Sequence, residues 1–371
     1  MKRILIFLLL LAVAGGLFAQ TLVWSGAVNA GLAVQKTDDA DDPLFGLIGK
    51  NVAGSSNGAY ARLHTTYTNE AGTAGFVGRI QASANPTNWS TALQLNRAYG
   101  WVTAGDGLFK LVGGRINAGE LAGIDSVWAD SFAGGTGIHA YVSPLGDLLK
   151  IGFGVNAKTG LGASLSGGDA PIWDNSPLIL WGGFGVESGF LSVASEIQYQ
   201  KSATNAHITA AAELGIVDID TGAYIYNINE LSDEGEMIFT ATFGFNVLDN
   251  LGLYVAGIYG LNNAEEDPYI GALVAVDYDL GVATPSLAVG YSTGGEDAYD
   301  SGLDSWRVVY SPTYNKNQVH LTVQPAVEIP LARGALEIGA AINKDMGDVA
   351  AAGSSNKGMS FAAFIDYRIT F

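Results

Sequence analysis

The residues most able to perform a chemical function are four arginines in the first third of the chain, Arg62, Arg79, Arg97 and Arg115. Arg62 and Arg79 lie equally far from the junction of Glu70 and Ala71, which falls in a predicted turn. Residues so placed in an antiparallel hairpin face each other, so Arg62 and Arg79 should be direct cross-strand neighbours. Because like charges side by side destabilise a sheet, such a pair indicates a functional role. The alternative is two long side chains surrounded by water.

The second pair, Arg97 and Arg115, lies equally far from Asp106, again in a predicted turn. The alternation of its strand gives Arg97 the same face as Leu95 and Trp101, which is an apolar face. Either a β-bulge turns these arginines toward the polar face, or they lie at a rim or a subunit contact. We expect the second arrangement.

The elements that carry these arginines are alternating segments of about ten residues, the length of transmembrane β-strands. A clear example has Leu149, Ile151, Phe153 and Val155 alternating with Lys150, Gly152, Gly154 and Asn156. The same pattern returns through residues 191–200, 237–247, 319–329 and 336–343. A β-sandwich would show the same alternation, so the connections must separate the two architectures.

The connections alternate between tight turns and longer, polar or Gly-rich loops. Tight turns are predicted at residues 69–72, 105–107, 145–147, 187–189, 248–250 and 332–334. The longer loops are Lys36 to Gly58, Asn117 to Gly137, Lys158 to Pro177, Thr293 to Asn317 and Lys344 to Gly358. Short turns on one rim and long loops on the other predict an all-β fold, a transmembrane antiparallel up-and-down β-barrel of about 16–18 strands. Two segments, 206–228 and 306–311, leave the strand number open.

The last strand has an unbroken apolar face and ends on an aromatic residue. Its apolar positions are Phe361, Ala363, Ile365, Tyr367, Ile369 and Phe371. This segment resembles the C-terminal signature strand of bacterial outer-membrane barrels. The resemblance implies that Tyr367, Ile369 and Phe371 close the barrel and that the barrel-assembly machinery is a partner.

The composition and the first residues agree with export. The chain is 48% hydrophobic and 15% charged, with no cysteine, whereas ordinary soluble domains contain about 25% charged residues. Lys2 and Arg3 precede the apolar run Ile4 to Val13, and small residues follow up to Ala19, which predicts a signal peptide over residues 1–19 and one barrel domain over 20–371. A membrane anchor is the alternative, but this run is short for one. The formal charge of −18 argues against nucleic acid as a partner.

The early hairpins also resemble a known family. Four fragments, residues 59–63, 75–79, 97–101 and 109–115, are similar in order and spacing to strands of the trimeric general diffusion porins of bacterial outer membranes. The resemblance covers roughly Thr21 to Ala157 and implies a homotrimer. In that family the third long loop folds into the pore, and its acids face a wall of arginines. Here this implies a constriction between Arg62 and Arg79 and loop Ile116 to Gly137, with Glu120, Asp125 and Asp130 on the loop.

We therefore expect an outer-membrane porin, a passive water-filled channel for small hydrophilic solutes and ions, in contact with outer-membrane lipid. No catalytic residue, cofactor or metal is expected. A surface-exposed structural barrel or adhesin that acts through its extracellular loops is an alternative, although the acidic cluster in Lys36 to Gly58 lacks the spacing of a calcium loop. A barrel enzyme such as an outer-membrane phospholipase is a further alternative. Its histidine would come from His64, His139, His207 and His320, none of which has an acid at a telling spacing.

Overall fold

The computed structural model describes residues 21–37, 43–48, 60–84, 91–116, 121, 135–157, 178–199, 204–230, 235–262, 268–293, 320–345 and 359–371. The strands in the first half are β1 (Thr21–Thr37), β2 (Leu44–Ile48), β3 (Tyr60–Thr68), β4 (Ala74–Ala84), β5 (Thr91–Ala104), β6 (Phe109–Ile116), β7 (Gly135–Val142), β8 (Pro144–Asp147), β9 (Leu149–Ala157) and β10 (Leu178–Ser188). Those in the second half are β11 (Leu191–Tyr199), β12 (Thr204–Glu213), β13 (Val217–Tyr226), β14 (Glu236–Leu248), β15 (Leu251–Asn262), β16 (Tyr269–Tyr278), β17 (Thr284–Thr293), β18 (His320–Leu331), β19 (Gly334–Asp345) and β20 (Met359–Thr370), with a 3-10 turn η1 (Ile228–Glu230) before β14.

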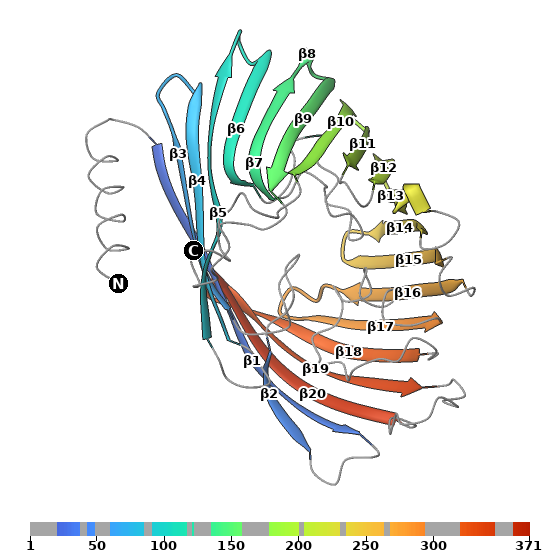
Figure 1. Ribbon diagram of the computed structural model, residues 1–371. Coiled ribbons are helices and arrows are strands. Elements are labelled where there is room, and N and C mark those ends of the chain that lie inside the picture. The colour runs from blue at the N-terminus through green and yellow to red at the C-terminus, as the bar shows by residue number, and fades with distance from the viewer. Residues whose placement is uncertain are drawn as a thin grey trace, which may run out of the picture.

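The strands form a closed ring in which sequence neighbours pair antiparallel (Figure 1). The ring closes where β20 pairs with β1, from Ala27 opposite Thr370 to Thr37 opposite Ser360. Eighteen strands make up the ring, because β2 only pairs with the end of β1 and β8 is a short piece beside a turn. The predicted all-β antiparallel barrel is confirmed, at the upper end of the predicted strand number. The region 206–228 forms β12 and β13, whereas 306–311 lies outside the described residues.

The connections alternate between the two rims as predicted. Short turns join β3 to β4, β5 to β6, β10 to β11, β12 to β13, β14 to β15 and β18 to β19. The turn at residues 105–107 uses left-handed backbone at Gly105, Asp106 and Gly107, with φ of 64°, 53° and 90°. Glycine and aspartate tolerate this conformation, which explains the Gly-Asp-Gly sequence. The five predicted long loops all connect strands at the opposite rim, and most of their residues lie outside the described ranges. We call the two edges the short-turn rim and the long-loop rim.

The two faces of the wall differ in polarity. Outward positions are apolar and exposed, for example Leu32, Ile138 and Phe153. Inward positions are largely polar and packed against one another, for example Asn29, Asn156 and Thr209. Exposed outward aromatics include Trp24, Phe109 and Tyr278 near the short-turn rim and Tyr199, Tyr259 and Phe361 toward the other. An apolar band between two aromatic girdles is the outer surface of a membrane-embedded barrel. Among the described residues, no helix has the length and apolar character needed to cross a membrane.

The terminal strand adopts the predicted alternation. Phe361, Ile365 and Phe371 are exposed on the outer face, whereas Phe364 and Asp366 are buried on the inner one. The main chain of Phe371 both donates to and accepts from Gly26, at 3.0 and 2.7 Å. A Cβ atom at position 26 would overlap the Phe371 ring, so glycine there lets the ring lie against β1.

Candidate functional site

The arginines of the early hairpins gather on the lumen face of consecutive strands. Arg62 on β3 lies opposite Gln81 on β4, and Arg79 lies opposite His64. The prediction that Arg62 and Arg79 are direct neighbours is therefore wrong: they share a face but are offset by two residues. The cause is the turn, where the Asn69 side chain accepts hydrogen bonds from the backbone N–H groups of residues 73 and 74, at 2.7 and 3.0 Å. This cap moves the centre of the hairpin one residue toward the C-terminus.

A β-bulge brings a third arginine to the same face. Arg79 pairs with Arg97, but the next residue, Ile80, pairs with Leu95, so Asn96 is an extra residue in β5. The extra residue reverses the alternation, since Leu95 points outward and Arg97 lies beside the inward Arg79. Our expectation that Arg97 sits at a rim or a subunit contact is wrong, and the bulge alternative holds. We call Arg62, Arg79 and Arg97 the arginine cluster.

The fourth arginine is placed differently. Arg115 lies opposite Ala98, one residue away from the predicted partner Arg97. It follows the outward alternation of β6, on which Phe109 and Leu111 are exposed. Its Nη1 donates to the main-chain carbonyl of Leu95, at 2.9 Å. Arg115 thus satisfies the main-chain carbonyl of Leu95 at the bulge that turns Arg97 inward.

The arginine cluster is strongly positive, and Arg62 within it is held by a polar and an aromatic contact. Arg62 Nε donates to Gln81 Oε1 at 2.5 Å, and its guanidinium carbon lies 4.2 Å from the centre of the Tyr60 ring. Arg62 and Arg79 are buried in the wall, with under a tenth of their surface exposed. The positive charges of Arg97 and Arg62 both act on Arg79. A row of guanidinium groups on three neighbouring strands favours anions and the negative ends of polar solutes.

An aromatic cluster lines the lumen next to the arginines. Val112, Ile116, Tyr141 and Trp181 form a buried group, with Tyr99 and Trp101 packed against it. His139, fully buried, stacks on Trp181 with ring centres 4.9 Å apart, and its Nε2 lies 2.7 Å from Asn156 Oδ1. These side chains come from β5, β6, β7, β9 and β10, so they tie five strands together.

The third long loop contributes one described residue, Leu121, which belongs to the same cluster. Leu121 Cδ1 lies 2.9 Å from the position that a Cβ atom would take at Gly183, on the lumen face of β10. Leu121, five residues after Ile116 at the end of β6, therefore lies at the inner surface of β10. The predicted constriction residues Glu120, Asp125 and Asp130 lie outside the described residues.

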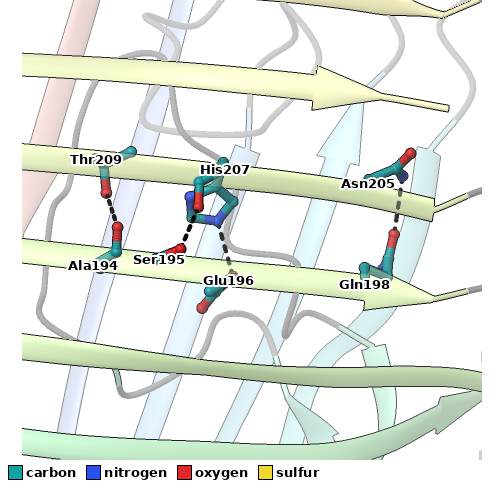
Figure 2. Close-up of polar contacts among 7 residues, drawn as sticks. All are labelled: Ala194, Ser195, Glu196, Gln198, Asn205, His207 and Thr209. Carbon is teal, nitrogen blue, oxygen red and sulfur yellow. Dashed lines mark hydrogen bonds and ion pairs between the residues drawn. The ribbon is translucent and has the colours of Figure 1, made fainter. Parts of the chain in front are cut away.

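A buried acid–histidine pair lies on β11 and β12, and sequence reasoning missed it (Figure 2). Glu196 Oε2 and His207 Nε2 are 3.1 Å apart, and both side chains are almost fully buried. Glu196 and His207 are equally far from the centre of the β11–β12 hairpin, a spacing that could have revealed them. Ser195 does not complete a catalytic arrangement, because its Oγ donates to the main-chain oxygen of His207 and not to the imidazole. The pair is a polar side-chain contact that joins β11 and β12 within the barrel wall.

Carboxylates occupy the lumen face next to the closing seam. Glu328 on β18, Glu337 on β19 and Asp366 on β20 are aligned across neighbouring strands. Arg368 Nη2 lies 3.6 Å from Glu328 Oε2 and offsets part of this charge. β1 separates this acidic row from the arginine cluster, so the lumen wall has zones of opposite sign on either side of the seam. Within the described residues, no three side chains of His, Asp or Glu are arranged to hold a metal ion.

Comparison with solved structures identifies the fold. OpdF (OccK2) of Pseudomonas aeruginosa in complex with glucuronate aligns with 94% of this chain and 98% of its own, at a TM-score of 0.58 and 10% identity. OpdQ of the same organism gives a TM-score of 0.56 at 10% identity, over 94% of this chain and 98% of its own. OccAB1 of Acinetobacter baumannii gives 0.54 at 10% identity, over 94% and 97%. No protein-family model and no curated protein matches the sequence. The chain has the fold of porin-like outer-membrane barrels.

Proposed function

We propose that the protein is an outer-membrane porin, a passive water-filled channel for small hydrophilic solutes and ions, with no catalytic activity. The observation that carries this proposal is the arginine cluster on the lumen face of a closed barrel whose outer face is apolar. Such a wall needs water on its inner side, because guanidinium groups are costly to bury without it. Export by the signal peptide over residues 1–19, insertion by the barrel-assembly machinery and a homotrimeric state complete the proposal.

The arginine cluster suggests that anions are favoured in the part of the lumen that it lines. Three positive charges on adjacent strands raise the local concentration of anions and lower that of cations. The OpdF (OccK2) structure contains glucuronate, an organic acid. We propose that small organic acids are suitable first solutes to test on this channel, alongside chloride.

Planar-bilayer recording of the refolded full chain tests the proposal. We expect discrete conductance steps in potassium chloride, and a reversal potential under a salt gradient that indicates anion preference. Glucuronate added to one side should carry current or reduce the chloride current. A correctly folded barrel that gives no conductance steps would instead favour an adhesin or structural barrel, which acts through its loops.

A further inference from the structure

The charged side chains on the outer face of the described strands are all positive and all lie near the long-loop rim. In the described strands of the ring, Lys36, Arg115 and Lys344 are the charged residues on outward positions. Each is the second-to-last residue of a strand that leads to the long-loop rim. The carboxylates in the described strands of the ring occupy lumen positions, for example Glu196, Asp277, Glu337 and Asp366. A positive charge in the apolar band is costly, but the cost falls to about 0–1 kcal/mol near the interface.

Two of these cations flank the closing strand. Lys36 on β1 lies opposite Phe361 on β20, and Lys344 on β19 lies opposite Met359, two residues further toward the loop. Both lysines are exposed. Their strands are separated by β20 alone, so the two backbones are roughly 10 Å apart. Two flexible lysine side chains can reach one group placed between them.

An apolar surface lies directly below the two lysines. Leu32, Ile365 and Ile338 form one exposed outward row across β1, β20 and β19. Between this row and Lys36 lie the smaller side chains of Val34, Ala363 and Ala340, and the next row, level with Lys36, contains Phe361 and Ile342. The face therefore offers cations at the rim and a shallow apolar surface beneath, the arrangement that matches an amphiphile with a negative head.

We propose that this outer face of β1, β20 and β19 binds a phosphate-bearing lipid, with Lys36 and Lys344 contacting the headgroup and the apolar surface contacting the acyl chains. The inference rests on the outer-membrane location proposed above. A second copy of the chain is a poorer occupant, because the outer faces of its described strands carry no carboxylate to offset the lysines. An anionic lipid supplies the missing charge and the apolar tail together.

Native mass spectrometry of the refolded full chain in neutral detergent tests this site. The probes are phosphatidylglycerol and phosphatidylcholine with identical acyl chains, and inorganic phosphate. The test variant is Lys36→Gln with Lys344→Gln. The control is Lys110→Gln with Lys150→Gln, which removes the same charge from the lumen face. We expect the wild type and the control to prefer phosphatidylglycerol, and its affinity to fall about fivefold for each outward lysine neutralised.

Any of three binding results would overturn the site, and so would the change in oligomer mass described next. The three are equal binding of the two lipids by the wild type, an unchanged preference in the test variant, and displacement of the lipid by inorganic phosphate. A change in oligomer mass without a change in lipid binding would assign the face to contact between copies, and would also overturn it. Conductance of the same preparations tests the porin proposal separately, because outward lysines do not alter the charge of the lumen.

Discussion

Arg79 on β4 and Arg97 on β5 lie directly opposite each other on the lumen face of the barrel. Like charges at this distance destabilise a sheet, and Asn96 is inserted into β5 at the point that brings them together. A regular strand would have turned Arg97 outward. The bulge therefore concentrates positive charge in the lumen, and it interrupts the regular hydrogen-bond ladder between β4 and β5.

The first prediction concerns ion preference. Replacing Arg79 with glutamine removes one positive charge and shortens a side chain in the lumen wall. Because one charge beside an ion in water-like surroundings contributes about 1 kcal/mol or less, chloride permeability should fall up to about fivefold. The permeability ratio of potassium to chloride should rise accordingly. Conductance should rise as well. Reversal potentials in bilayers under a low-salt gradient measure the effect.

The matched control for this prediction is Arg333→Gln, because Arg333 is exposed in a turn at the short-turn rim. It removes the same charge at the rim, outside the arginine cluster, and should leave the reversal potential close to that of the wild type. Equal shifts in the two variants would mean that overall charge, and not the arginine cluster, sets the preference.

The second prediction concerns the closing seam. Deleting Phe371 removes its two main-chain hydrogen bonds to Gly26 and the ring that lies on β1. The protein should be exported but assemble poorly, with loss of heat-modifiable gel mobility and abnormal surface protease patterns. Phe190→Ala is the control, since Phe190 is equally exposed, at 60%, in a turn at the same rim. Normal mobility in the deletion variant would show that the terminal aromatic is dispensable.

Sequence patterns predicted the barrel well because a wall between lipid and water imposes a strict two-residue alternation. They failed where one residue breaks that alternation. Asn96 is inserted in β5, and the Asn69 cap shifts the first hairpin by one position. Neither feature is visible in the polarity pattern. Alternation therefore placed Arg97 on the wrong face, and counting from the predicted turn misplaced Arg62 relative to Arg79.

The Glu196–His207 pair was missed for a related reason. Its two residues face each other only if the centre of the β11–β12 hairpin is known, and no turn was predicted between these strands. Considered separately, Glu196 and His207 each have the pattern of an ordinary polar residue that lines the lumen. The acidic row at the seam was harder still to predict from the sequence. Its members come from three strands, and the registers of all three must be known to align them.

The third prediction concerns this pair and stability. His207→Ala leaves the buried Glu196 without its imidazole partner, which should cost about 3 kcal/mol of unfolding free energy. The double variant Glu196→Gln with His207→Gln keeps polar groups of similar size and removes the charge, so it should lose less. Urea unfolding of the refolded barrel in vesicles measures both. A larger loss in the double variant would contradict the role of the pair in joining β11 and β12.

The fourth prediction concerns topology. Because the long loops share one rim, tags inserted in 158–177 and in 293–317 should both be reached by antibody on intact cells. A tag in the turn at residues 105–107, on the other rim, should be reached only after the outer membrane is opened. Labelling of the turn tag on intact cells would invert the orientation of the barrel.

The last prediction concerns the third long loop. Leu121 is packed among lumen side chains, so at this residue the loop lies against the inner wall. We expect the acids of the loop to face the arginine cluster. Neutralising Asp125 and Asp130 together would then shift the reversal potential toward anions, opposite in sign to the Arg79 change. If the loop instead projected outside, these acids would be screened within a Debye length of about 8 Å. Glu70→Gln, in an exposed turn, is the control for removing an acid far from the loop. Unchanged reversal potentials at low ionic strength would remove the loop acids from the constriction and leave the arginine cluster as its charged part.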